Sequence, residues 1–219
     1  MDDVSILATS TSISTNCQLL AKAYRKCQEW ARKHSSNFNA KKSELIHFTC
    51  KATEGFALGD NWIAPQRLIR ILGVYLNTSL SPKAHLQYLQ SKIPGLLGSL
   101  RLLTQSTWGL GLETARRVYI GAIRPALSYG ALTWFPIKNP STSLRETLRG
   151  WQGRFLQIIT GAYKATATEA LEIETGVELL DLYLQKTALT GLERQASILG
   201  STLEHLAQRL YQAQRSKRH

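Results

Sequence analysis

Acidic side chains, cysteines and long apolar runs are all scarce in this 219-residue sequence. Each scarcity argues against one class of protein or one kind of site. No apolar run approaches the roughly 18 residues that a membrane-spanning helix needs, and no basic-then-apolar leader precedes a cleavage site. We therefore expect an intracellular protein without membrane contact. The three cysteines form no Cys-x-x-Cys pair and the five histidines show no metal-ligand spacing, which argues against a zinc site.

The shortage of acidic residues is local. The chain holds 27 Lys and Arg against 15 Asp and Glu, a formal net charge of +12. Residues 82–165 hold 11 basic residues against 2 acidic ones, whereas residues 166–219 hold 6 against 7. A basic excess concentrated in one segment is typical of a surface for a polyanion such as nucleic acid, and it is equally compatible with a solubilising surface.

The pattern of apolar residues predicts an α+β fold in two parts. Residues 4–8 and 43–50 read as strands, residues 52–61 as a hairpin tip, and residues 68–77 as one strand with Gly73 in its middle. A helix ending near residue 34 carries an apolar stripe that includes Cys17 and Cys27. The remainder predicts helices over 82–104, 111–124, 126–135, 143–161, 166–174 and 177–213, two of them opened by capping boxes at Ser143/Glu146 and Thr166/Glu169. We thus expect a small antiparallel sheet with one long helix, followed by an all-α region.

The order of several short motifs resembles a known enzyme family. "MDD" before a strand and a helix, then "FNAKKSELIHF", then "RILGVYLN", follow the order of motifs that close the palm of non-LTR (LINE-type) retrotransposon reverse transcriptases. The helical segments "ETARRVYIGAIRPALSYGALTWF" and "QGRFLQIITGAYKATATEALEIETGVELL" resemble the thumb and connection of the same elements. The resemblance implies a partial palm at residues 1–81 and a thumb and connection region at residues 82–219.

This resemblance also implies a catalytic role for three residues near the start of the chain. Asp2 and Asp3 would be the end of an aromatic-x-Asp-Asp turn and would bind the Mg²⁺ ions that clamp the attacking and leaving oxygens in phosphoryl transfer. Lys42 would lie near the departing pyrophosphate, where it would stabilise developing charge or donate a proton. The alternatives are a frayed acidic terminus for the aspartates and a solvated side chain for the lysine.

Further residues would contact nucleic acid. Leu72, Gly73 and Val74 match the primer-grip motif, where the backbone at Gly73 would let a primer approach; the alternative is an ordinary β-bulge. Rows of arginines at helical spacing suit phosphate contacts and are formed by Arg116, Arg117, Arg124, Arg145 and Arg149.

The family's substrates are an RNA template, a DNA primer and deoxynucleotides, and its expected location is the nucleus. The resemblance places a further catalytic aspartate and the nucleotide-holding fingers upstream of Asp2, in a missing N-terminal part of the polymerase. We therefore expect this fragment of an RNA-directed DNA polymerase to be inactive alone. The alternative is a non-catalytic, basic helical module that binds nucleic acid or a protein partner.

Overall fold

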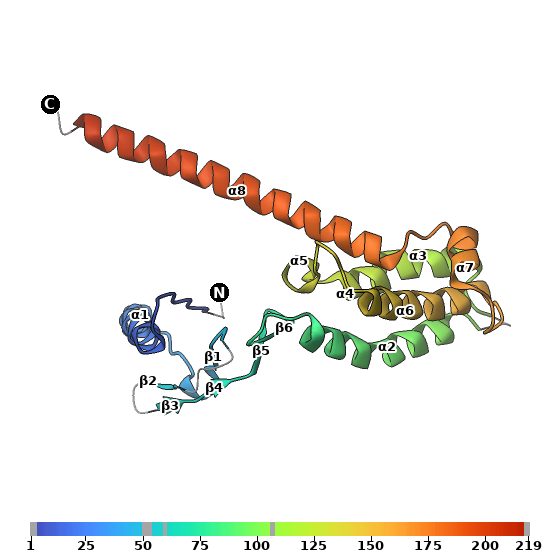
Figure 1. The fold of residues 1–219 in the computed structure, drawn as a ribbon, viewed down its shortest axis with the longest axis horizontal. Coiled ribbons are helices and arrows are strands. Elements are labelled where there is room, and N and C mark those ends of the chain that lie inside the picture. The colour runs from blue at the N-terminus through green and yellow to red at the C-terminus, as the bar shows by residue number, and fades with distance from the viewer. Residues whose placement is uncertain (1–3, 50–53, 59–60, 106–107, 217–219) are drawn as a thin grey trace. The chain divides into compact units, whose positions relative to one another are not determined.

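The computed structural model divides into two compact units, Met1–Ala84 and His85–His219 (Figure 1). It describes residues 4–49, 54–58, 61–105 and 108–216, and for Ala40, Leu58 and residues 201–216 it describes the backbone alone. Helices and small sheets together confirm the predicted α+β class. Among the described residues, no helix is both long and apolar enough to cross a bilayer.

The first unit is built around one amphipathic helix, α1 (Ile13–Lys33). Its Leu20 and Tyr24, together with Phe56, pack against a small core of Leu45 and Ile63. Cys17 and Ala31 of the same helix are also buried, which confirms the predicted apolar stripe. Residues 4–8 form no strand, contrary to our prediction. A strand requires a hydrogen-bonded neighbour, and no described strand pairs with this segment.

Among the described residues, the strands of this unit form three separate two-stranded pieces instead of one antiparallel sheet. β2 (Phe56–Leu58) pairs antiparallel with β3 (Asn61–Ile63), so a hairpin forms here, but residues 56–58 of the predicted tip are its first strand. β1 (Leu45–Ile46), however, pairs parallel with β4 (Pro65–Gln66). The chain between β1 and β4 contains the β2–β3 hairpin, and this long connection makes parallel pairing possible.

The segment predicted as one strand over residues 68–77 is a hairpin. β5 (Leu68–Ile71) pairs antiparallel with β6 (Val74–Asn77), and Leu72 and Gly73 make the turn. Their φ angles of 46° and 87° are both positive, as a type I′ turn demands. Gly73 therefore reverses the chain and is neither a bulge nor a mid-strand residue.

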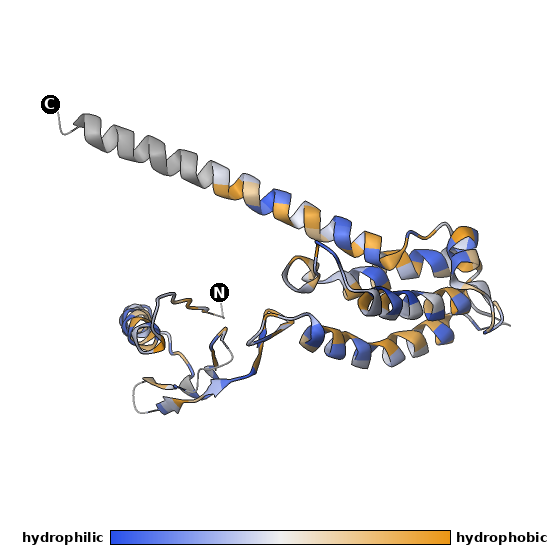
Figure 2. Ribbon diagram, in the orientation of Figure 1, coloured by the Kyte–Doolittle hydropathy of each residue, from blue (hydrophilic) through white to orange (hydrophobic). Residues whose placement is uncertain are grey.

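The described part of the second unit is all helical. Its elements are α2 (Lys83–Leu103), α3 (Leu112–Val118), the π-helical turn η2 (Tyr119–Ile123), α4 (Arg124–Ser128), α5 (Ala131–Trp134), α6 (Thr142–Thr160), α7 (Thr168–Thr175) and α8 (Leu180–Ser216). Hydrophobic and hydrophilic residues alternate along these helices (Figure 2). The core has at its centre Ile93, Tyr119, Leu148, Phe155 and Leu184, each at most 1% exposed.

The predicted helix break at Pro125 is wrong, because the chain turns instead at Gly130, whose φ is +65°. Proline removes a backbone donor and clashes with the carbonyl four residues earlier. Here Pro125 lies in the first turn of α4, directly after η2. The wider π turn accommodates the proline without ending the helical path.

Neither predicted capping box forms. Ser141 is the N-cap of α6, and its side-chain oxygen accepts a hydrogen bond from the backbone N–H of Leu144 at 3.3 Å. α7 begins after Ala167, which offers no side-chain cap. Ser143 and Thr166 therefore lie two and one residues away from the true N-cap positions, a typical error for helix ends argued from sequence.

Candidate nucleic-acid interface

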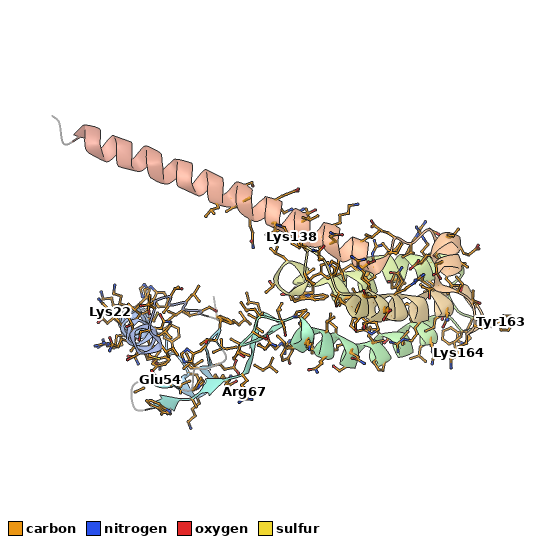
Figure 3. The ribbon with its side chains drawn as sticks, viewed as in Figure 1. Lys22, Glu54, Arg67, Lys138, Tyr163 and Lys164 are labelled. Carbon is orange, nitrogen blue, oxygen red and sulfur yellow. The ribbon has the colours of Figure 1, made fainter. Side chains whose placement is uncertain are left out.

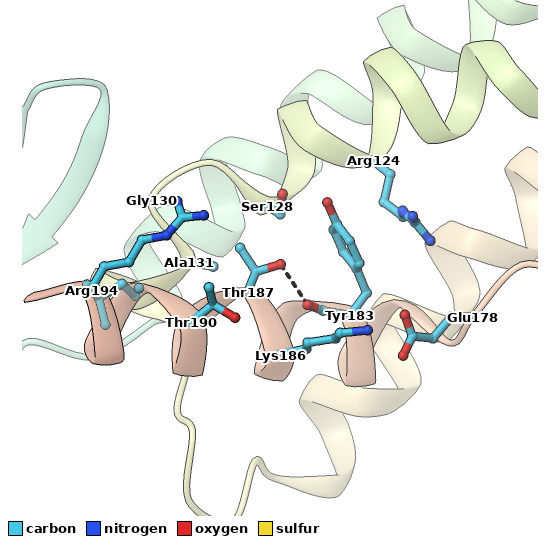
Figure 4. A pocket seen from close by; sticks show the side chains of 12 residues that line it. Arg124, Ser128, Gly130, Ala131, Glu178, Tyr183, Lys186, Thr187, Thr190 and Arg194 are labelled. Carbon is cyan, nitrogen blue, oxygen red and sulfur yellow. Dashed lines mark hydrogen bonds between the residues drawn. The ribbon is translucent and has the colours of Figure 1, made fainter. Parts of the chain in front are cut away.

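A pocket of about 540 Å³ opens in the second unit between α4, α5 and the first half of α8 (Figure 4). Three cationic side chains line it, those of Arg124, Lys186 and Arg194, against the single carboxylate of Glu178. Ser128, Thr187 and Thr190 add hydroxyl groups to the wall. The lining therefore combines positive charge with neutral hydrogen-bonding groups, which suits an anionic ligand.

Helical spacing on α8 assembles most of this wall. Tyr183, Lys186, Thr187, Thr190 and Arg194 follow one another at intervals of three, one, three and four residues, so they share one face of the helix. The hydroxyl of Thr187 donates to the carbonyl of Tyr183 at 2.8 Å, which holds that side chain against its own helix (Figure 4).

Gly191 brings α5 close to this face of α8. A Cβ at Gly191 would lie 3.3 Å from Cδ2 of Leu132, closer than ordinary contact. A larger residue would push α5 away and widen the pocket, so glycine here sets the separation of the two helices.

Arg124 crosses to α8 from the start of α4. Its guanidinium carbon lies 3.9 Å from the centre of the Tyr183 ring, a cation–π contact that fixes the side chain in the pocket wall. Its Nε is buried and has no hydrogen-bond partner among the described residues. A buried donor without a partner is costly, and an acceptor bound in the pocket would satisfy it.

Arg116, the first of the predicted arginines, is held by the end of a helix. It is half-buried, and its Nε donates to the carbonyl of Thr175 while Nη2 donates to the carbonyl of Gly176 at 3.4 Å. These carbonyls are at the C-terminal end of α7, which carries partial negative charge. Arg116 therefore caps α7.

The other three arginines form ion pairs on the surface. Nε of Arg117 lies 3.2 Å from Oε1 of Glu113, one helical turn earlier. Arg145 lies 4.0 Å from Asp181 of α8, and Arg149 pairs with Glu169 of α7. Of the five predicted arginines, only Arg124 lines the pocket. The nucleic-acid role of the other four stays a prediction.

A buried polar network holds the helices behind the pocket. Gln152 of α6, with no exposed surface, donates from Nε2 to Oε1 of Glu172 at 2.8 Å and to the carbonyl of Glu178 at 3.3 Å. It also accepts from the hydroxyl of Tyr119 at 3.3 Å. Burial raises the pKa of Glu172, an effect that the hydrogen bond from Gln152 partly offsets. The same burial raises the pKa of Tyr119, so its hydroxyl stays protonated.

The residues predicted for catalysis and primer grip belong to the first unit. Asp2 and Asp3 lie outside the described residues, so their Mg²⁺ site stays a prediction. Lys42 is exposed at the end of a 3₁₀ turn, η1 (Ala40–Lys42). Leu72 is 72% exposed at the hairpin tip, and Val74 is buried. Within the part of the chain that the structure describes, no three His, Cys, Asp or Glu side chains gather as metal ligands.

Comparison with known proteins yields relatives of one kind. A retrovirus-related Pol polyprotein from type-1 retrotransposable element R1 4 of Nasonia vitripennis is 31% identical over 119 residues. An R1 Pol polyprotein of Bradysia coprophila is 28% identical over 138 residues, and another of Nasonia vitripennis is 24% identical over 183 residues. The chain is a relative of R1 non-LTR retrotransposon Pol polyproteins. These matches cover 54%, 61% and 80% of the chain.

The chain matches only part of each R1 Pol polyprotein: 30%, 14% and 54% of their lengths, in the same order. No protein-family model matches the chain, and no solved structure matches it either. The relationship to R1 Pol polyproteins confirms the family resemblance drawn from the motif order.

Sequence reasoning missed Lys186 and Arg194, since they lie in a segment with no net basic charge. The signal that could have found them is their spacing of eight residues with Tyr183, Thr187 and Thr190 between, on a helix that was correctly predicted.

Proposed function

We propose that the chain is the end of the palm together with the thumb and connection region of a non-LTR retrotransposon reverse transcriptase. In this proposal its helical unit binds the phosphodiester backbone of an RNA template and DNA primer at the α4–α8 pocket. The observation that carries the proposal is the similarity to R1 Pol polyproteins over as much as 80% of the chain. The cationic pocket supports the same ligand class, because Lys and Arg contacts to phosphate give affinity without sequence readout.

The catalytic part of the proposal concerns Asp2 and Asp3. Their adjacent carboxylates are the oxygen donors that Mg²⁺ prefers, and the ions would supply charge stabilisation for nucleotidyl transfer. The resemblance assigns the third aspartate and the fingers to sequence that these 219 residues do not include. Assayed alone, the chain should therefore extend no primer with Mg²⁺ or Mn²⁺. Nucleotide incorporation that Asp2→Asn abolishes would refute this part.

The binding part is tested by the salt dependence of affinity. The purified chain is titrated with a fluorescent RNA–DNA duplex at several salt concentrations, using two unrelated sequences. If three to four phosphates are contacted, log K should fall with log salt at a slope of about −3, with no preference between the sequences. Replacing Lys186 and Arg194 together by Gln removes two pocket cations, so the slope should become shallower by about 2.

A matched control distinguishes the pocket from general positive charge. Arg154 and Lys164 are exposed basic residues of the same unit that do not line the pocket, and Lys164 lies in the loop after α6 (Figure 3). Replacing this pair by Gln removes the same formal charge and should change the slope by less than half as much. A third variant, with Arg117 and Arg145 replaced by Gln, tests the predicted arginine rows. Loss of binding in that variant, with the pocket variant unchanged, would move the interface to those rows.

The alternative is a non-catalytic module that binds nucleic acid or a protein partner, and it differs from the leading proposal in catalysis. A longer protein that carries the missing palm aspartate and the fingers decides between them. Metal-dependent extension that requires Asp2 supports the polymerase. Binding without any extension by that longer protein supports the module.

A further inference from the structure

Two hydroxyl groups in the wall of the α4–α8 pocket already use their protons within the protein. The hydroxyl of Thr187 donates to the carbonyl of Tyr183 at 2.8 Å, and that of Ser128 donates to the carbonyl of Pro125 at 3.2 Å. A hydroxyl has one proton to donate and two lone pairs that accept. Because Ser128 and Thr187 both line the pocket, their oxygens offer it hydrogen-bond acceptors.

Glu178 adds a third acceptor to the same pocket. An ionised carboxylate accepts hydrogen bonds and donates none. The backbone of Glu178 is held in place by Gln152, whose Nε2 donates to its carbonyl at 3.3 Å. A carboxylate repels a phosphate and binds a hydrogen-bond donor instead. The pocket is therefore built for more than a bare anion.

Cationic groups lie on either side of the two hydroxyls. In the view of Figure 4, Ser128 and Thr187 lie between the guanidinium groups of Arg194 and Arg124. The Nε of Arg124 is buried without a hydrogen-bond partner among the described residues. The pocket volume of about 540 Å³ falls within the roughly 300–1,000 Å³ of pockets that hold small ligands, so a sugar fits beside a phosphate. Donors for a phosphate and acceptors for a neighbouring group thus share one site.

Only one of the two nucleic-acid backbones supplies a donor for these acceptors. Within a DNA strand, the phosphate and sugar oxygens all accept hydrogen bonds and none donates one. Each RNA nucleotide adds a 2′-hydroxyl, which both donates and accepts. Resting on the proposed binding of nucleic acid at this pocket, we propose that Ser128 and Thr187 accept a hydrogen bond from a ribose 2′-hydroxyl while the pocket cations hold the adjacent phosphate. The pocket then distinguishes an RNA strand from a DNA strand.

The test compares two fluorescent hybrids of one sequence with the full-length chain. Both contain the same DNA strand, and the RNA strand carries either its natural 2′-hydroxyls or a 2′-fluoro group in place of each one. Fluorine removes the donor while the phosphate charge and the A-like geometry stay. The wild-type chain should bind the ribose hybrid about 5- to 10-fold more tightly. Thr187→Val keeps the shape of the side chain and should reduce this ratio to about 2-fold or less, by weakening binding of the ribose hybrid alone.

Thr147→Val is the matched control. Thr147 of α6 makes the same kind of bond, from its hydroxyl to the carbonyl of Ser143 at 2.8 Å, and it does not line the pocket. This variant should keep the wild-type ratio. Ser128→Ala should lower the ratio as Thr187→Val does, and it gives a second reading in case one variant folds poorly. Circular dichroism checks the helix content of all three.

Three results would overturn the proposal. The first is a wild-type ratio near 1, and the second is a ratio that survives both Thr187→Val and Ser128→Ala. The third is an equal loss of affinity for both hybrids in these variants. The phosphate site is measured separately, by the salt slope of the chain with Lys186 and Arg194 replaced by Gln. Recognition of ribose can therefore fail while binding of the phosphodiester backbone at the pocket stands, and an unchanged slope would count against the pocket itself.

Discussion

Gln152 offers the sharpest test of how the helical unit is held together. Its side chain has no exposed surface and joins three elements: it accepts from Tyr119 and donates to Glu172 and to the backbone of Glu178. Gln152→Met keeps the length and volume of the side chain while removing every hydrogen bond. The change in stability therefore measures the loss of these hydrogen bonds without the added cost of a cavity.

The expected loss of stability follows from the groups left behind. A hydrogen bond to a charged group contributes about 1.5–3 kcal/mol, and Glu172 loses such a bond. The hydroxyl of Tyr119 loses a neutral bond of about 1 kcal/mol. We expect Gln152→Met to lower the free energy of unfolding by about 3–4 kcal/mol at neutral pH. Tyr119→Phe removes only the 3.3 Å bond and should cost about 1 kcal/mol.

The pH dependence of this loss has a definite sign. Burial raises the pKa of Glu172 above 4.5, and the donor that lowers it is Gln152, so the variant raises this pKa further. A carboxyl whose folded-state pKa is raised binds its proton first in the folded state as the pH falls. Folded stability therefore increases as the pH falls through the folded-state pKa toward 4.5. The deficit of Gln152→Met relative to wild type should accordingly shrink on acidification.

Urea unfolding of the full chain followed by circular dichroism at pH 7 and pH 5 measures these differences. The double variant Gln152→Met, Glu172→Met removes donor and acceptor together, and it should recover at least half of the lost stability. A deficit below 1 kcal/mol at pH 7 would refute the reasoning, and so would a deficit that grows on acidification. Either result would mean that water reaches these groups and that the network is not sealed.

Three other predictions follow from single contacts. Arg116→Met should lower the free energy of unfolding by about 1–2 kcal/mol, because the C-terminal carbonyls of α7 lose their donor. Arg117→Met removes only an exposed ion pair, so it should change the free energy of unfolding by less than about 0.5 kcal/mol in the same urea assay. Burial lowers the pKa of His85, so as the pH falls this side chain takes up its proton in the unfolded state before it does so in the folded state. The stability of the protein should therefore decline as the pH falls below 6.5. In thermal scans, His85→Phe should flatten that decline. Gly73→Ala should destabilise the β5–β6 hairpin by about 1 kcal/mol, because φ is +87° at this position, while Leu72→Asn should be tolerated. Amide hydrogen exchange in the hairpin measures the two effects. Faster exchange in Leu72→Asn than in Gly73→Ala would contradict both expectations.

Most helices of the second unit were predictable, whereas the pairing of the strands in the first unit was not. Helix α6 was expected at residues 143–161 and lies at Thr142–Thr160, since its apolar spacing fixes which face is buried. The β5–β6 hairpin was missed because Leu72 and Gly73 lack the Asn-Gly or Asp-Gly signature of type I′ turns, and leucine rarely adopts positive φ. The strand expected at residues 4–8 failed for a different reason: a strand depends on a partner, and apolar alternation says nothing about whether one is present.

The candidate interface shows why net charge by segment is a poor guide to a binding surface. Residues 82–165 hold most of the basic excess, yet the structure pairs Arg117, Arg145 and Arg149 with carboxylates. Two of those carboxylates, Asp181 and Glu169, belong to the segment that balances its own charge. Among the described residues, neither Lys186 nor Arg194 forms an ion pair, although both belong to that segment. The net charge of a segment adds together charges that lie on different faces of a helix and cancel in the sum, whereas a ligand contacts one face at a time. A cationic pocket can therefore be lined largely by a segment whose own net charge is near zero.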